Sequence, residues 1–245
     1  MEILTLNKVS LTYFSNNGET QALKDISFGV NQGDFISIVG PSGCGKTTIL
    51  SIISGLIHPT SGNIINQEEK SFIGYMFQKD NLLEWRTILG NVYLGLELQN
   101  KKTNENIQYV NNLLKKYNLW EFRDKYPNQL SGGMRQRVSL IRTLALRPSI
   151  LLLDEAFSAL DYQTRLKVCD DVYKIIKEEG LTAILVTHDI GEAISLSDKI
   201  IILSARPAIV KKQLQINLNH IDSPFDRRET LEAKSYFEEI WRELQ

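Results

Sequence analysis

Apolar and polar positions change their spacing several times along the 245-residue chain. In residues 3–13 and 23–30 they roughly alternate, which is typical of half-buried antiparallel strands. Short apolar runs separated by helical stretches follow, and they predict buried parallel strands with crossovers. The sequence therefore predicts an α/β fold with a mainly parallel sheet and an N-terminal antiparallel β subdomain. The predicted buried strands are Phe35–Val39, 150–153, 182–187 and Lys199–Leu203.

The middle of the chain has a different pattern. From residue 88 to about residue 126 it is polar, rich in Asn and Lys and mostly helical in period. We expect an inserted helical subdomain at about residues 88–147, within one domain that spans residues 1–245. Residues 208–245 form a C-terminal extension, in which strand-like alternation precedes an amphipathic helix. Further predicted elements are helices at 47–54 and 161–179, a turn at 59–62 and a strand at 72–77.

Charge and cysteine content narrow the function classes. Lys and Arg number 28 against 29 Asp and Glu, so we expect no nucleic-acid partner. The two cysteines, Cys44 and Cys169, give no disulfide framework and no metal-ligand spacing, which favours a reducing compartment. The apolar runs are shorter than the roughly 20 residues that a membrane helix needs, and the first residues do not have the pattern of a signal peptide. Membrane association would therefore depend on a partner.

Residues 40–47 match the phosphate-loop pattern, between a predicted strand and a predicted helix. Glycines let backbone N–H groups converge on phosphate oxygens, Lys46 can reach the β- and γ-phosphates, and the Thr47 hydroxyl can bind Mg²⁺. The alternative is a glycine-rich turn without a ligand. Cys44 occupies a variable position, where the helix terminus could lower its pKa, although simple tolerance is favoured over a redox sensor. The nucleotide-binding candidates are Gly40, Pro41, Ser42, Gly43, Cys44, Gly45, Lys46, Thr47 and Thr48.

Two adjacent acids, Asp154 and Glu155, follow the apolar run at 150–153. Ligands of doubly wound sheets bind at this carboxyl edge. Asp154 would hold Mg²⁺, and Glu155 would act as general base on the attacking water. Such acids can instead cap the next helix, but the phosphate loop earlier in the chain favours catalysis.

Residues 130–136, with the sequence LSGGMRQ, resemble the signature sequence of ABC ATPases. The Ser131 hydroxyl and exposed N–H groups of Gly132 and Gly133 are typical of an anion-binding turn before a helix. The spacing alone would indicate only a capped helix. The resemblance implies a P-loop NTPase with the ABC ATPase core, which binds ATP and Mg²⁺. It also implies a dimer, because in this family the segment completes the nucleotide site of the opposite subunit.

Four further positions resemble family motifs. Tyr13 resembles the aromatic residue that stacks on adenine, and Gln78 the glutamine that senses Mg²⁺ and the attacking water. His188 resembles the switch histidine at the γ-phosphate, and Asp161, in residues 158–161, the loop that crosses to the partner. Each has a structural alternative: an exposed strand-end tyrosine, a polar strand terminus, a structural histidine and a helix N-cap.

Within the family, the likeness is to ATPases of nitrate, sulfonate and taurine importers. It is carried by residues 78–87, which end in Trp-Arg-Thr, by Met134 and by residues 203–207. Ala156 and Glu84 stand where the family usually has proline, and neither change removes a chemical group. The resemblance implies a peripheral protein at the cytoplasmic face of the membrane. The partners that it implies are a second, identical ATPase subunit, a permease and a separate substrate-binding protein.

Two other functions are alternatives to import. A soluble ABC ATPase of DNA repair or translation usually has two cassettes or a long coiled coil, and this chain has one cassette and no sustained heptads. A non-hydrolysing regulatory cassette would lack a catalytic group, whereas Lys46, Asp154, Glu155 and His188 are all present.

Overall fold

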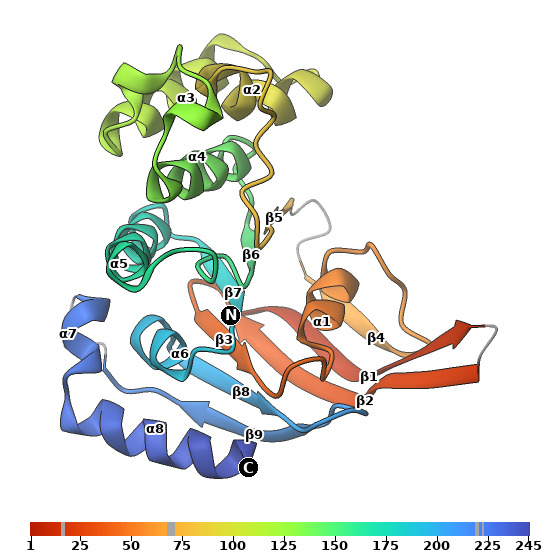
Figure 1. Cartoon of the computed structure of the whole chain (residues 1–245). Coiled ribbons are helices and arrows are strands. Elements are labelled where there is room, and N and C mark those ends of the chain that lie inside the picture. The colour runs from red at the N-terminus through yellow and green to blue at the C-terminus, as the bar shows by residue number, and fades with distance from the viewer. Residues whose placement is uncertain (16–17, 68–71, 219–220, 222) are drawn as a thin grey trace.

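The computed structural model describes residues 1–15, 18–67, 72–218, 221 and 223–245. An antiparallel sheet of order β2-β1-β4 lies at one side of the molecule (Figure 1). The alternating segments form β1 (Glu2–Ser15) and β2 (Gly18–Asn31), as predicted. The turn predicted at 59–62 is wrong in its second half, because β4 (Ser61–Asn66) already pairs with β1 at Ser61. Gly62, with φ of 80°, lies against the Lys8 backbone where a Cβ would clash, so a turn-like residue serves a strand.

The central sheet has the order β5-β6-β7-β3-β8-β9 and is parallel except for β9. Its strands confirm the predicted apolar runs and the predicted strand before Gln78. Every residue of β3, β6 and β7 is buried, which explains the absence of alternation in these runs. The strands are β5 (Ile73–Met76), β6 (Ile150–Asp154), β7 (Thr182–Val186), β3 (Phe35–Val39), β8 (Lys199–Leu203) and β9 (Val210–Gln215).

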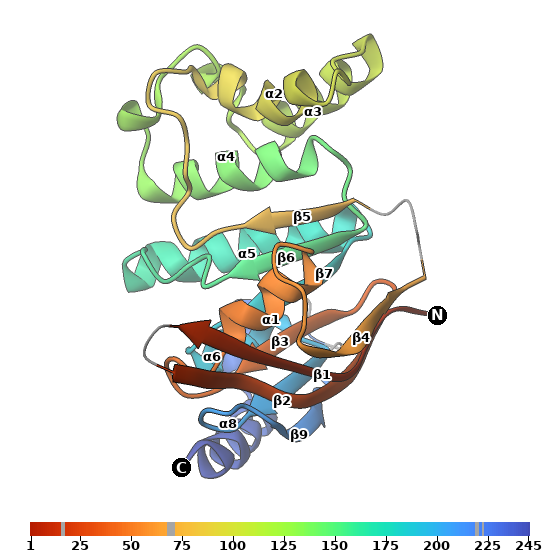
Figure 2. The ribbon, with the colours of Figure 1, turned by 90° about the vertical axis from the view of Figure 1, so that its right-hand side faces the viewer.

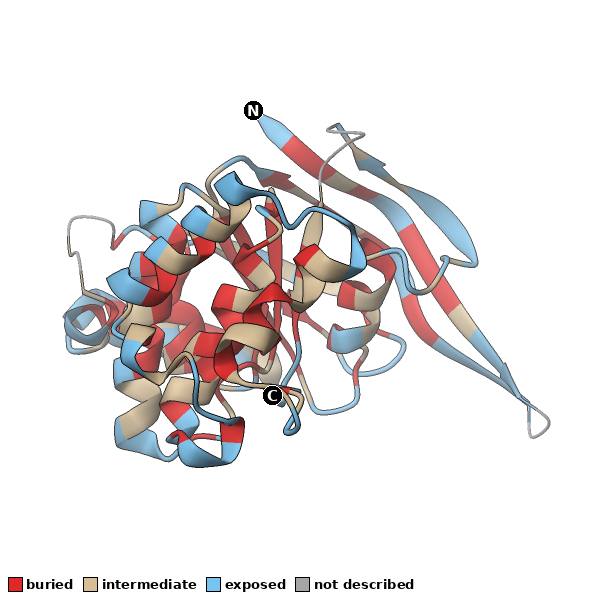
Figure 3. Cartoon of the chain, turned by 90° about the horizontal axis from the view of Figure 1, so that it is seen from above, coloured by how far each residue is buried: buried red, intermediate tan, exposed pale blue. Residues whose placement is uncertain are grey.

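Two apolar layers enclose the central sheet. On β6, Leu151 and Leu153 pack with α5 (Tyr162–Glu178) and the helical end of the molecule. Ile150 and Leu152, which point to the opposite face, pack with α1 (Lys46–Ile53) and the antiparallel sheet. In Figure 3 the buried residues gather where these layers meet, and the exposed ones lie on the outer faces.

Three helices gather at one end of the molecule, beyond β5 and β6 (Figures 1 and 2). They are α2 (Ile88–Leu98), α3 (Asn104–Lys116) and α4 (Gly132–Leu144). Two short 3₁₀ turns, η1 (Trp120–Phe122) and η2 (Pro127–Gln129), connect α3 to α4. The helical character of this region is confirmed, while its division at 88–147 stays a prediction.

The C-terminal segment packs on the opposite end (Figure 1). It contains β9, the edge strand, and then α7 (Pro224–Arg228) and α8 (Leu231–Leu244), while α6 (Ile190–Leu196) precedes β8. Ala233 and Ile240 of α8 join a small core with residues of α6 and β8. Within the described residues, no helix combines the length and apolar character needed to span a membrane.

Candidate active site

The phosphate loop lies between the end of β3 and the start of α1. Gly43 and Gly45 have φ of 71° and 123°, which L-residues with side chains rarely adopt. Gly45 also lies so close to Leu23 of β2 that a Cβ would be 2.8 Å from Cδ2. Ser42, Gly43 and Thr47 are exposed, so the loop opens to solvent at the positive end of α1.

Lys46 is only 6% exposed and is held by its own loop. Its Nζ donates to the carbonyl oxygens of Gly40, at 2.9 Å, and Pro41, at 3.1 Å. The Lys46 ammonium group therefore already lies inside the phosphate loop. If phosphate oxygens bound in this loop, the N–H groups of the ammonium would be in position to donate hydrogen bonds to them.

Thr47 and Asp154 meet at the carboxyl edge of the sheet, although 107 positions separate them. The Thr47 hydroxyl donates to Asp154 Oδ1 at 2.9 Å, and the Tyr75 hydroxyl donates to Oδ2 at 2.9 Å. In an octahedron with Mg–O bonds of about 2.05 Å, neighbouring oxygens lie about 2.9 Å apart. The separation and the hard oxygen donors of Thr47 and Asp154 therefore fit the predicted Mg²⁺.

Burial, the charge of Asp154 and the hydrogen bond to it raise the pKa of Tyr75 well above its usual range. Tyr75 therefore remains a neutral donor to the carboxylate. Sequence reasoning missed this residue, and its only signal was a tyrosine in the strand that ends before Gln78.

Glu155 lies between Gln78 and His188. Gln78 Nε2 donates to Glu155 Oε2 at 3.3 Å and to Ser158 Oγ at 3.1 Å, and His188 Nδ1 lies 3.6 Å from the same Oε2. Glu155 has φ of 46°, so the chain turns sharply after β6. Its side chain is 27% exposed and that of His188 is 58% exposed, which leaves this carboxylate accessible to water. The structure thus brings together Glu155, Gln78 and His188, three of the predicted catalytic residues.

Tyr13 of β1 lies beside the phosphate loop. Its hydroxyl is 3.3 Å from Thr48 Oγ1, and the residue is 43% exposed. This placement suits the predicted contact with adenine and also the alternative of an exposed strand-end tyrosine.

At Cys44 the structure supports the favoured alternative, simple tolerance of a cysteine, over a redox sensor. Cys44 is 1% exposed, and burial raises the pKa of its thiol despite the neighbouring Lys46 ammonium, which acts in the opposite direction. The helix terminus does not prevail because the sulfur lies inside the loop, close to Gly40.

The segment around Ser131 begins α4, where Ser131 Oγ accepts from Met134 N at 3.4 Å. Gly132 is exposed and Gly133 is buried as a residue, and the exposure of the Gly133 N–H stays a prediction. A Cβ at Gly133 would lie 3.0 to 3.1 Å from methyl groups of Val168 and Thr164, so close helix packing explains this glycine. In Figures 1 and 2, α4 lies across β5 and β6 from α1, so one chain does not bring this segment to its own phosphate loop.

Asp161 caps α5, because its Oδ1 accepts from Thr164 N at 3.1 Å. Hydrogen bonds from the side chain and the backbone N–H of Thr164 lower the pKa of Asp161, and the backbone bond corresponds to the capping alternative. A contact of residues 158–161 with a second subunit stays a prediction.

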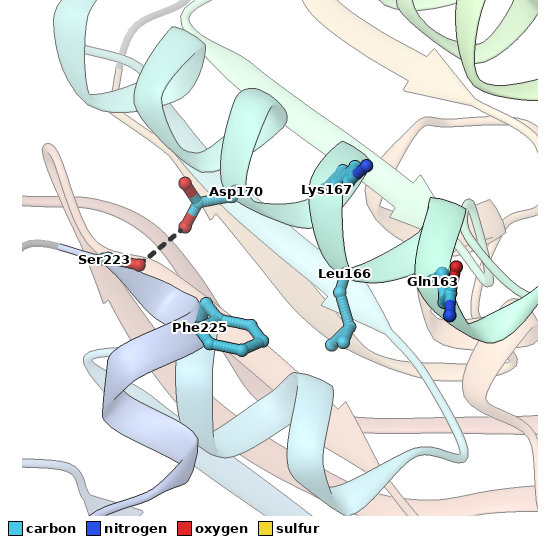
Figure 4. Close-up of a pocket in the computed structure, with 6 residues that line it drawn as sticks. All are labelled: Gln163, Leu166, Lys167, Asp170, Ser223 and Phe225. Carbon is cyan, nitrogen blue, oxygen red and sulfur yellow. Dashed lines mark hydrogen bonds between the residues drawn. The ribbon is translucent and has the colours of Figure 1, made fainter.

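A separate cavity of about 450 Å³ lies between α5 and α7 (Figure 4). Leu166 and Phe225 form its apolar part, and Ser223 Oγ donates to Asp170 at 3.1 Å at its polar end. None of the predicted site residues lines this cavity. The candidate nucleotide site is instead the open loop surface at the carboxyl edge of the sheet.

A family model described as ABC transporter matches residues 23–158, which include the phosphate loop, the signature segment and both acids. The chain belongs to this family. Hydrolysis is supported by a solved ABC cassette in a dimeric, post-hydrolysis state bound to ADP and Pi, MJ0796. It is 34% identical with a TM-score of 0.72 and covers 87% of this chain and 99% of its own. The chain is therefore an ABC ATPase that binds ATP.

Curated relatives place it among transporter subunits. The uncharacterized ABC transporter ATP-binding protein YtlC of Bacillus subtilis is 47% identical over all of this chain and 96% of its own length. The taurine import ATP-binding protein TauB of Ruegeria pomeroyi is 36% identical over 96% of this chain and 90% of its own. The aliphatic sulfonates import ATP-binding protein SsuB of Bacillus anthracis is 38% identical over 89% and 87%. The chain is thus an ATP-binding subunit of the ABC transporter type, and the resemblance to importer ATPases is confirmed.

Proposed function

We propose that this ABC ATPase works as a dimer that hydrolyses Mg-ATP and drives a membrane permease importing a small anion such as taurine, a sulfonate or nitrate. The observation that supports a dimer is that the signature segment lies apart from the phosphate loop and the acids of the same chain. The phosphate loop and the acids meet at one edge of the sheet, while α4, which Ser131 caps, lies across β5 and β6 from α1. A second copy facing the first would supply its Ser131 and Gly132 to the open phosphate loop.

Each site residue has a role that its position supports. Lys46 and the loop N–H groups would bind the phosphates, and Tyr13 would contact the adenine. Thr47 and Asp154 would hold Mg²⁺, which when bound neutralises phosphate charge. Gln78 would help orient the water near that ion.

Glu155 would accept the proton of the attacking water, because its accessible carboxylate faces the open edge of the site. His188 would donate a hydrogen bond to the γ-phosphate from the end of β7. Residues 158–161 with Asp161 would contact the partner subunit, and product release would reopen the dimer.

The loop at 78–87 is the proposed permease-facing surface. Trp85 is 75% exposed, whereas the loop beneath it is held rigidly by buried Asn91, whose amide bonds the backbone of residues 83, 86 and 87. Glu84, which stands where the family usually has proline, pairs with Arg135 of α4 at 2.9 Å. An exposed aromatic side chain on a fixed loop suits a protein interface. Docking there would place the chain on the cytoplasmic face of the membrane, while a separate binding protein would select the anion.

The test compares wild type with Glu155→Gln, by phosphate release and by light scattering after size exclusion with Mg-ATP. Removing the base should lower turnover about a hundredfold or more and leave ATP binding intact, so the variant should accumulate as an ATP-dependent dimer. Glu105→Gln, at an exposed glutamate, is the matched control and should behave as wild type. Wild-type turnover in Glu155→Gln would refute the assignment of the base, and a variant that stays monomeric with Mg-ATP would refute the dimer.

A further inference from the structure

Arg165 connects two loops that flank the candidate site. It lies in the first turn of α5, and its Nη2 donates to the Leu160 carbonyl at 3.0 Å. Its Nη1 lies 3.5 Å from Asp189 Oδ2. Leu160 belongs to residues 158–161, and Asp189 directly follows His188, so one guanidinium contacts both segments.

A buried hydrogen-bond network fixes the backbone around His188. The Thr187 hydroxyl donates to Glu192 Oε2 at 2.7 Å and accepts from Asp189 N at 3.0 Å. Asp189 Oδ1 in turn accepts from Glu192 N at 3.0 Å. Glu192 is 3% exposed, so the two residues next to His188 are tied to a carboxylate in the protein interior. The exposed His188 ring therefore depends on this network for its position.

One contact in the network is incomplete. Arg165 Nε and Glu192 Oε1 lie 3.9 Å apart, and both atoms are buried without a hydrogen-bond partner among the described residues. Leaving these two polar atoms buried and unpaired costs free energy. A relative movement of about 1 Å would bring them to about 2.9 Å, where a hydrogen bond forms, and such a movement is therefore favoured. Asp189 and Arg228 are also charged groups close to Glu192. Arg228 Nε donates to Ser195 Oγ at 3.3 Å, and Arg228 Nη2, like Arg165 Nε, is buried without a partner among the described residues.

We propose that Arg165 is a positioning residue that links residues 158–161 to His188. A displacement of residues 158–161 moves the guanidinium through the Leu160 carbonyl, closes or opens its contact with Glu192, and so shifts Thr187, His188 and Asp189 together. This rests on the proposed function, in which residues 158–161 contact the partner subunit. Through Arg165, binding of the partner then alters the place of His188 relative to Glu155.

The experiment observes His188 directly. The chain has three histidines, so ring signals in ¹³C-histidine-labelled protein are few, and His188→Gln identifies the relevant one. In Arg165→Met the His188 signal should shift while that of His58 stays, and kcat should fall about tenfold with an unchanged KM for ATP. Lys174→Met, which removes an ion pair from the same helix, should leave the signal and kcat unchanged.

Glu192→Gln provides a second variant that keeps the side-chain shape, and it should shift the same signal if Arg165→Met does not fold. An unmoved His188 signal in the folded variants, or a shift equally large at His58, would overturn the link. A failure of the proposed function can be told apart from a failure of this proposal. It would appear as absent ATP turnover in wild type, while the histidine ring signals would still report on the link between Arg165 and His188.

Discussion

Tyr75→Phe isolates the hydrogen bond that holds Asp154. The substitution removes only the hydroxyl that donates to Oδ2, and it keeps the ring that stacks on Phe77 at 4.4 Å. Asp154 is 8% exposed, so water replaces the lost donor poorly. A hydrogen bond to a charged group contributes about 1.5–3 kcal/mol, and we expect a loss of about 2 kcal/mol in unfolding free energy. For a protein of this length that corresponds to a fall in Tm of about 4–8 °C.

The raised pKa of Tyr75 also predicts how the stability difference between wild type and Tyr75→Phe changes with pH. Since the pKa of Tyr75 is raised in the folded protein, the folded state retains a proton that the unfolded chain releases near pH 10. The contribution of the neutral Tyr75 hydroxyl to the unfolding free energy is therefore fully present below about pH 10. Above that pH it falls by about 1.4 kcal/mol per pH unit. The difference between wild type and Tyr75→Phe should shrink accordingly.

Urea unfolding of both proteins at pH 7, 9 and 10.5 measures this difference. Tyr162→Phe, at a tyrosine that is 66% exposed, is the matched control and should stay within about 0.5 kcal/mol of wild type. The reasoning would be refuted if Tyr75→Phe were as stable as this control at pH 7, or if its deficit grew above pH 10.

Three further predictions concern burial. Cys44 and Cys169 should react with a disulfide reagent far more slowly in the folded than in the unfolded protein, because burial raises the pKa of both thiols; equal rates would contradict this. Arg227→Met should destabilise the C-terminal helices by about 2 kcal/mol or more, since the 2% exposed guanidinium bonds two carbonyls and a tyrosine hydroxyl. Hydrogen exchange confined to α7 and α8 should then accelerate, and unchanged protection would argue against it. Asn91→Ala should increase quenching of Trp85 fluorescence by acrylamide, because four hydrogen bonds to its loop are lost; quenching as in wild type would disprove the role.

The sequence predicted those parts of the fold and site that contiguous residues specify. The buried strands were recognisable because residues covered on both faces leave an unbroken apolar run, as in β6 and β7. Glycines and a lysine at fixed spacing likewise specify a loop by backbone freedom alone, and Gly43 and Gly45 adopt the positive φ that the motif requires. Local chemistry therefore identified the phosphate loop and the two acids.

Other features depended on which strands became neighbours. The first two residues of β4 were predicted to lie in a turn because Ser61 and Gly62 are turn residues, and only pairing with β1 makes them part of a strand. The helix terminus next to Cys44 could lower the pKa of its thiol, but packing buries the side chain, in agreement with the favoured alternative of simple tolerance. The residues adjacent in sequence determine neither the pairing of Ser61 and Gly62 with β1 nor the burial of Cys44.

The sequence by itself determined the fold class, the phosphate loop, the acids at the end of β6 and membership of the importer-like ABC family. The tertiary structure decided that Tyr75 donates to Asp154, 79 positions away, and that Arg165 reaches both residues 158–161 and the loop of His188. The physical reason is that backbone preferences act between neighbours in sequence. Hydrogen bonds between distant side chains exist only once the order β5-β6-β7-β3 has brought their strands side by side.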